Sequence, residues 1–158
     1  MTQHVLISLE ERHANNILAG IKTVELRRRS MHVAPGTLVW IYVKKPVGGV
    51  VGFAIAGERY AATPDTVWRK FGPVSGLARK EFMEYFVGCK EASAMPLGAP
   101  MRLPRSVGLE ELRENVPGFH PPQFYARVDE ESPLRNLLTA RLPRRHAASR
   151  LTRHLVMN

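Results

Sequence analysis

The chain has 158 residues, of which 44% are hydrophobic and 23% charged, and its formal net charge is +9. These values are typical of a globular chain that buries a core without disulfides or metal, and they exclude wholesale disorder. The single cysteine, Cys89, excludes an internal disulfide. No Cys/His spacing indicates zinc, so no metal or cofactor is predicted. The absence of a secretory pattern and of an apolar run of membrane length favours a cytoplasmic protein that does not enter membranes.

A strand, a helix and a second strand are predicted over the first thirty residues. Residues 4–8 are apolar and rich in β-branched side chains, which predicts a strand, and Ser8 is placed to cap the next element. Residues 9–19 predict a helix that ends at Gly20. Residues 22–29 alternate apolar and polar side chains, which indicates a half-buried strand with a charged outer face.

The remainder of residues 1–131 predicts short strands and short helices. Thr63 and Pro64 are typical first residues of a helix, and Ser75 is placed to cap the next one. The predicted strands cover residues 37–43, 50–60, 90–97, 99–103 and the end of 121–128, and the predicted helices cover 64–70, 75–87 and 108–114. Glycines inside the second of these strands indicate bends or bulges. This order predicts an α+β fold built on a small, strongly bent sheet or barrel with flanking short helices.

Most of the positive charge lies near the C-terminus. Residues 1–131 contain 17 Lys+Arg and 14 Asp+Glu, a net of +3, whereas residues 132–158 contain six arginines and no acidic residue, a net of +6. We therefore predict a domain over residues 1–131 and a basic extension over residues 132–158, helical or partly disordered. A balance of this sign favours a polyanionic partner such as nucleic acid.

The extension carries two different signals. After a Ser132-Pro133 helix start, leucines recur at helical spacing. These leucines are Leu134, Leu137, Leu138 and Leu142. They either dock onto the domain or join two subunits into a homo-oligomer. Residues 144–156 predict a second, basic helix, in which Arg144, Arg145 and Arg150 are expected to contact phosphates without sequence preference.

One motif narrows the family. Residues 20–27, GIKTVELR, fit the pattern G-x-K-x-x-E-x-R, with a predicted helix before them and two strong predicted strands after them. Over roughly residues 3–129 the chain resembles the ASCH domain family, which belongs to the PUA-like superfamily. The resemblance implies a PUA-like β-barrel with a cleft lined by the motif, and binding of RNA, DNA or a nucleoside. Some relatives of this family are hydrolases, including a ribonuclease and an amidohydrolase that acts on acetylated cytidine.

The motif brings a lysine, a carboxylate and an arginine together. Glu25 and Arg27 are two residues apart and so share one strand face, and Lys22 stands at the strand entrance. In a binding protein, Lys22 and Arg27 contact phosphates or base edges while Glu25 accepts a hydrogen bond from a base amino group. In a hydrolase, the general base is Glu25, or Lys22 if burial lowers its pKa. The alternative is an exposed Glu25–Arg27 ion pair of little consequence.

One departure from the family pattern limits the chemistry. The position that matches Glu25 is a threonine nucleophile in the acetylcytidine amidohydrolases, and a carboxylate is a far less usual nucleophile for amide hydrolysis. This difference argues against that activity but not against hydrolysis in general.

Further residues extend the predicted nucleic-acid site. Arg29 continues the basic run, and Lys44 can follow a nucleic-acid backbone. Tyr42, which shares a strand face with Trp40, either stacks on a base or packs in the core. Trp68 is interpreted as a packing residue rather than part of a base-binding cage.

Three functions are compatible with the sequence. The first is an RNA-binding PUA-like domain. The second is a metal-independent hydrolase, either a ribonuclease or a modified-nucleoside amidohydrolase, that uses the same residues. The third is a protein-interaction domain that uses its leucine-rich tail.

Overall fold

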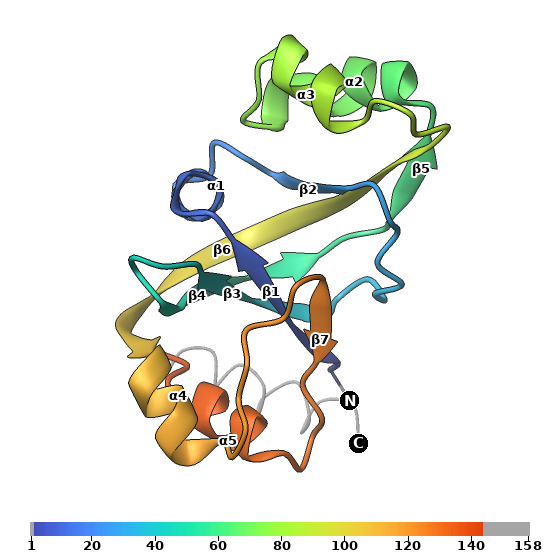
Figure 1. The fold of residues 1–158 in the computed structure, drawn as a ribbon. Helices are drawn as coiled ribbons and strands as arrows, with labels where there is room; N and C mark the ends of the chain where they lie inside the picture. Colours follow the sequence, from blue (N-terminus) through green and yellow to red (C-terminus); the bar gives the residue numbers. More distant parts are fainter. Residues whose placement is uncertain (1, 144–158) are drawn as a thin grey trace.

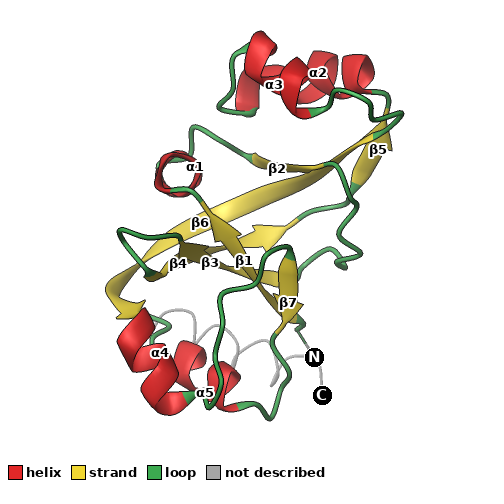
Figure 2. Cartoon of the chain, viewed as in Figure 1, coloured by secondary structure: helices red, strands yellow, loops and turns green. Residues whose placement is uncertain are grey.

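A computed structural model describes residues 2–143 and shows an α+β fold arranged around one curved sheet (Figure 1). Helices α2 and α3 lie at one end of the molecule, and α4 and α5 lie at the other (Figures 1 and 2). The elements in chain order are β1 His4–Leu9, α1 Glu11–Leu18, β2 Val24–Arg27, β3 Leu38–Val43, β4 Gly49–Ala56, β5 Tyr60–Ala62, α2 Pro64–Phe71, the 3-10 turn η1 Gly72–Val74, α3 Arg79–Tyr85, β6 Ala92–Gly108, α4 Leu109–Asn115, β7 Tyr125–Arg127 and α5 Pro133–Thr139.

The sheet follows the strand order β2-β6-β4-β3-β1-β7, and β5 also pairs with β6. Strands β1 and β3 are parallel, and the other pairs are antiparallel. Strand β6 is 17 residues long and holds the sheet together, because its first part pairs with β2 and β5 and its later part with β4. The two separate strands predicted over this segment are therefore wrong. Ala99, with φ of 46°, lies within this single long strand, which crosses the molecule diagonally (Figure 2).

The predicted bend at Gly52 is confirmed. The pairing of β4 with β6 shifts register between Val50 and Gly52. A Cβ atom at Gly52 would lie 2.5 Å from the carbonyl oxygen of Met101 and 2.7 Å from the side chain of Leu18. Glycine is needed here because the β6 backbone and the α1 side chain come too close to β4 to leave room for a side chain. These shifts allow the sheet to curl into a half-barrel.

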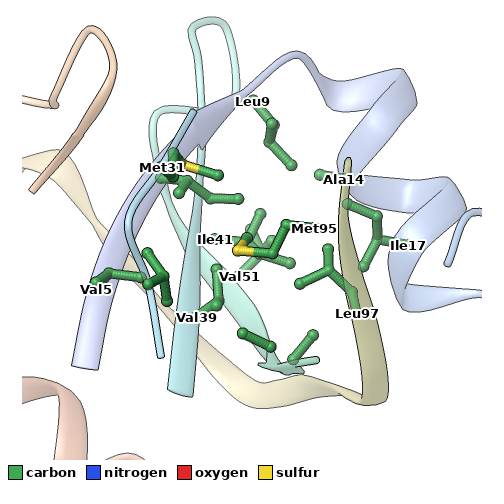
Figure 3. Packing of buried hydrophobic residues seen from close by; sticks show 14 of the residues in the cluster. Val5, Leu9, Ala14, Ile17, Met31, Val39, Ile41, Val51, Met95 and Leu97 are labelled. Atoms are coloured by element: carbon green, nitrogen blue, oxygen red, sulfur yellow. The ribbon is translucent and has the colours of Figure 1, made fainter. Parts of the chain in front are cut away.

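Three hydrophobic clusters fill the fold. The first lies inside the curve of the sheet, where side chains from β1, β3, β4 and β6 meet α1 (Figure 3). The second lies on the opposite face, where Trp40, Tyr42 and Phe53 pack with residues of α4 and α5. The third lies between β2, the start of β6 and the α2–α3 pair. One face of strand β2 is consequently covered by α2 and α3, and its other face points into the concave interior of the sheet.

The leucine-rich segment belongs to the domain. Leu138 of α5 is fully buried in the second cluster, and Leu134, Leu137 and Leu142 pack against the same cluster. Arg135 also donates from its two guanidinium nitrogens to the carbonyl oxygens of Val128 and Thr2. Of the two possibilities that the sequence left open, docking onto the domain holds for these leucines. The predicted boundary at residue 131 thus falls inside a packed unit.

Two of the predicted helix caps are confirmed and two are wrong. Thr63 accepts a hydrogen bond from the backbone of Thr66, and Ser132 accepts one from the backbone of Arg135. Ser8, however, lies within β1, and Glu10 precedes α1 without a side-chain cap. The Ser75 side chain stabilises the turn before α3 instead of capping that helix. Within residues 2–143, no helix is long and apolar enough to cross a membrane.

Candidate functional site

The motif strand β2 pairs with β6 and carries its charged side chains inward. The register places Glu25 opposite Met95. Opposed residues in an antiparallel pair project from the same face, and Met95 belongs to the cluster inside the curve. Val24 and Leu26 face the other way and pack under α2 and α3. The predicted charged outer face is therefore wrong, because helices cover that side and Glu25 and Arg27 face the concave interior.

Glu25 is a buried carboxylate with one unsatisfied oxygen. Glu25 is 7% exposed, and its Oε1 lies 3.2 Å from Nε of Arg27. That contact lacks hydrogen-bond alignment, and Glu25 Oε2 has no hydrogen-bond partner among the described residues. Burial raises the pKa of Glu25, while the charges of Arg27 and Lys22 act in the opposite direction. A buried acceptor without a donor is costly, so a donor supplied by a ligand would be bound favourably here.

Lys22 is buried at the entrance of the same strand. The residue is 4% exposed, and its Nζ donates to the carbonyl oxygen of Ser75 at 2.5 Å. Gly76 lies against the lysine stem, because a Cβ built there would be 3.5 Å from two of its carbon atoms. Burial lowers the pKa of Lys22, Glu25 opposes this, and the nearby arginines Arg12 and Arg27 add to the lowering. Lys22 has no ion-pair partner within residues 2–143.

Two arginines share one aromatic ring beside Glu25. The guanidinium carbons of Arg27 and Arg29 lie 5.8 Å and 5.5 Å from the centre of the Phe124 ring. Arg28 lies on the other side of the strand, over the Tyr85 ring at 4.8 Å, where its Nε also donates to the Tyr85 carbonyl oxygen. Alternation along the chain therefore separates the arginines, with Arg27 and Arg29 on the Glu25 side.

Three residues near the motif were missed by the sequence reasoning. His13 lies in α1, and its Nδ1 is buried without a hydrogen-bond partner among the described residues. Burial lowers the pKa of His13, and the charges of Lys22 and Arg12 act in the same direction. Ser75 supplies the carbonyl that holds Lys22, and Phe124 supplies the ring beneath the arginines. These contacts join residues far apart in the chain, 53 positions in the case of Lys22 and Ser75, so no local pattern signals them.

Other predicted site residues lie elsewhere. Tyr42 is 2% exposed and its ring centre lies 6.3 Å from that of Phe119, so it packs in the core and its predicted contact with nucleic acid is wrong. Lys44 is exposed in the turn after β3, and its described hydrogen bonds do not connect it to the motif. Arg144, Arg145 and Arg150 lie outside the described residues.

The part of the chain that the structure describes contains no group of three or more His, Cys, Asp and Glu residues able to hold a metal ion. A cavity of about 800 Å³ lies between α2 and α3 rather than at the motif. The motif residues instead form a compact charged cluster, Lys22–Glu25–Arg27, which Arg29 and Phe124 border on one side.

The fold defines the class of the protein. The human THYN1 protein, solved in complex with 5-methylcytosine-containing DNA, matches the chain with a TM-score of 0.54 and 14% identity over 90% of this chain and 99% of that chain. At this identity the similarity concerns the fold alone. The two proteins share this fold, a curled sheet with helices at both ends, which agrees with the PUA-like arrangement expected from the sequence.

Sequence similarity then specifies the family. The crystal structure of ASCH from Zymomonas mobilis matches with a TM-score of 0.81 and 32% identity over 86% of this chain and 94% of that chain. A curated relative from Zymomonas mobilis, the "ASCH domain-containing ribonuclease", is 34% identical over 129 residues, which are 82% of this chain and 86% of the relative. The chain belongs to the ASCH domain family. No protein-family model matches it.

Proposed function

We propose that this protein binds RNA through the Lys22–Glu25–Arg27 cluster and the adjoining Arg29. The observation that carries the proposal is the buried Glu25 carboxylate, which has a cation on one oxygen and no partner on the other. Nucleic-acid bases carry amino groups that donate to such an oxygen, and the flanking cations match the phosphates. A ribonuclease among the relatives at 34% identity supports RNA as the ligand.

The exposure of the residues suggests an order of contact. Lys22 and Glu25 are 4% and 7% exposed, whereas Arg29 is exposed and its guanidinium already lies over the Phe124 ring. A stacked guanidinium keeps its edge free to donate to a phosphate, and it loses less rotamer entropy than a free side chain. We infer that the arginines hold the backbone first. A base then reaches Glu25 when Phe124 or the 72–78 segment shifts.

Replacement of Arg29 by alanine should weaken binding of single-stranded RNA roughly tenfold, because one charge-assisted contact to a phosphate is lost. The logarithmic salt slope should fall by about 0.7. The measurement is fluorescence anisotropy of labelled RNA at several salt concentrations.

Arg28→Ala is the matched control for this prediction. It removes the exposed arginine that precedes Arg29, whose guanidinium lies over the Tyr85 ring instead of the Phe124 ring. Its RNA affinity should stay close to wild type. Equal losses in both variants would mean that only the overall charge matters, and the proposed face would be wrong.

A second candidate function is metal-independent cleavage of RNA by the same cluster. Burial moves the pKa values of Glu25 and Lys22 toward each other, which suits an acid–base pair. The Glu25 carboxylate takes the proton of a 2′-hydroxyl, the 2′-oxygen attacks phosphorus, and the bond from phosphorus to the 5′-oxygen breaks. Lys22 gives its proton to the departing 5′-oxygen, while Arg27 balances charge on the phosphate. The products are a 2′,3′-cyclic phosphate and a 5′-hydroxyl.

This scheme predicts a narrow bell-shaped pH profile for cleavage. The acid limb should lie above the ordinary glutamate pKa of about 4.3, because burial raises the pKa of Glu25 and activity needs the ionised form. The alkaline limb should lie below the ordinary lysine pKa of about 10.4, because burial lowers the pKa of Lys22 and activity needs the ammonium. Initial rates on a fluorogenic RNA from pH 4 to 10 measure both limbs.

The exposed variant Arg28→Ala should keep both limbs of that profile. Loss of the alkaline limb in Lys22→Met together with an unchanged rate at neutral pH would remove Lys22 from the mechanism. A cleavage rate that stays constant between the ordinary pKa values of glutamate and lysine, and falls only near those values, would exclude the acid–base pair.

Two further properties are proposed from the C-terminal part. Arg144, Arg145 and Arg150 add sequence-independent affinity for phosphates, since the last 27 residues contain six arginines and no acidic residue. Association of two copies through the leucines is a weaker proposal, because Leu138 is already buried in the core of its own chain.

A further inference from the structure

A second cluster of aromatic and basic side chains lies apart from the motif. The cavity of about 800 Å³ between α2 and α3 is lined by Asp65, Trp68, Arg69, Gly72, Pro73 and Arg79. Both helices lie at the end of the molecule opposite α4 and α5 (Figure 1). We call this cavity the α2–α3 pocket. None of the motif residues lines it, so a ligand there would occupy a separate site.

Trp68 is a half-buried ring held in one position. The Phe82 ring supports it at 5.1 Å between ring centres. Gly72 comes close to the ring, since a Cβ at that position would lie 2.9 Å from two ring carbons. A ring fixed from two sides loses little freedom when a planar group stacks on its remaining surface. Trp68 packs against the third cluster, as the sequence indicated, and part of its ring remains accessible.

The charges of the pocket suit an anion beside this ring. Arg69 ends α2 and Arg79 begins α3, and both side chains are exposed. Neither arginine has an ion-pair partner within residues 2–143, and Arg69 makes only a 3.3 Å hydrogen bond to the Thr66 hydroxyl. Asp65 adds one carboxylate, which can accept from a base amino group or a sugar hydroxyl. An aromatic ring, two cations and one acceptor are the groups that recognise a nucleotide.

The pocket is connected to the motif by one short segment. Gly72 and Pro73 form part of the pocket wall, and Ser75, three residues after Gly72, holds Lys22. The Ser75 hydroxyl also donates to the Gly72 carbonyl oxygen at 2.8 Å, and Ser75 is fully buried. A 3-10 turn rises about 2.0 Å per residue, so Gly72 and Ser75 are separated by roughly 6 Å along it. One nucleic-acid strand can therefore contact both sides of this segment.

We propose that the α2–α3 pocket binds a nucleotide of the same single-stranded nucleic acid that the motif cluster holds, with a base stacked on Trp68 and a phosphate between Arg69 and Arg79. The proposal rests on the proposed function. It adds a second contact point along the strand and makes Gly72–Ser75 the link between the two sites.

Tryptophan fluorescence tests this site directly. The chain has two tryptophans, and Trp40 is fully buried in the core, so quenching by a stacked base reports Trp68. The probe is 2′-O-methyl hexauridylate, which cannot be cleaved through its 2′-oxygen. We expect it to quench the full-length protein, and Trp68→Phe, which keeps an aromatic platform, should remove the quenching but keep most of the affinity.

Charge variants provide the second readout. The double variant Arg69→Ala/Arg79→Ala should bind the probe about tenfold more weakly, and its salt slope should fall by about 1.4, at roughly 0.7 for each lost contact. The matched control Lys80→Ala/Lys90→Ala also removes two exposed cations, but neither residue lines the pocket. Trp68→Leu should weaken binding roughly fivefold to a hundredfold. Circular dichroism of each variant confirms that it is folded.

The outcomes separate this inference from the proposed function. Binding by anisotropy of a labelled probe without Trp68 quenching, or equal losses in the two double variants, overturns the pocket and leaves the motif site standing. Absence of binding in both measurements overturns both proposals. Equal quenching by inorganic polyphosphate, which has no bases, or by hexaglutamate would show an anion or peptide site and overturn the nucleotide assignment.

Discussion

Replacement of Glu25 by glutamine should make the protein more stable and, on the proposed cleavage mechanism, much slower in RNA cleavage. Glutamine keeps the volume of the side chain and an oxygen facing Arg27, but it removes a charge from a site that is almost fully buried. We expect cleavage to fall by roughly a hundredfold to ten-thousandfold, the usual contribution of a general base. We also expect Tm at neutral pH to rise by about 2–4 °C, which corresponds to about 1 kcal/mol in a chain of this size.

The sign of the stability change follows from the pKa of Glu25. Burial raises that pKa in the folded protein, so the folded state holds its proton at pH values where the unfolded chain has lost it. The contribution of Glu25 to the stability is therefore fully present below the ordinary pKa of about 4.3. It is lost as pH rises through the pKa that Glu25 has in the folded protein. The advantage of glutamine should shrink as pH falls toward that ordinary value. Thermal unfolding at several pH values measures it.

Glu58→Gln is the matched control, because Glu58 is an exposed carboxylate near the end of β4. It should change neither Tm nor cleavage. A Glu25→Gln protein that cleaves RNA at the wild-type rate would exclude Glu25 as the base. A lower Tm at neutral pH would show that the ion pair with Arg27 outweighs the cost of burying the charge.

Truncation of Leu138 to alanine should lower the stability by about 2–5 kcal/mol, the range for a fully buried leucine. For a chain of this size that corresponds to a Tm lower by roughly 5–15 °C. The reason is that α5 is part of the second core cluster and packs beside α4. RNA affinity at low temperature should be retained, since Leu138 lies in a different cluster from the motif residues.

Val87→Ala is the control for the loss of an apolar group. Val87 is 74% exposed, so its replacement should change the stability by no more than about 0.5 kcal/mol. An unchanged Tm in Leu138→Ala would contradict the packing of α5.

The same packing decides where a truncation is informative. Removal of residues 132–158 would damage the core, whereas removal of 144–158 removes four arginines and leaves α5 intact.

Local chemistry allowed much of the fold to be predicted. Helix starts at Thr63-Pro64 and Ser132-Pro133, the apolar run that became β3, and the left-handed Gly20 all depend on neighbours within a few residues. Backbone preferences and short-range hydrogen bonds of this kind are set by the residue types themselves. The alternation in GIKTVELR likewise put Glu25 and Arg27 on one face, and the residue types of this motif were enough to indicate the family.

The tertiary structure alone decided which side of each element is covered. Alternation separates Glu25 from Leu26 but does not say that α2 and α3 cover the leucine side and turn the carboxylate inward. The same limit explains why Tyr42 became core and why Lys22 meets a carbonyl 53 residues away. The α2–α3 pocket depends on two helices packing together. Such contacts join distant parts of the chain, so their outcome depends on the whole packed arrangement rather than on any local pattern.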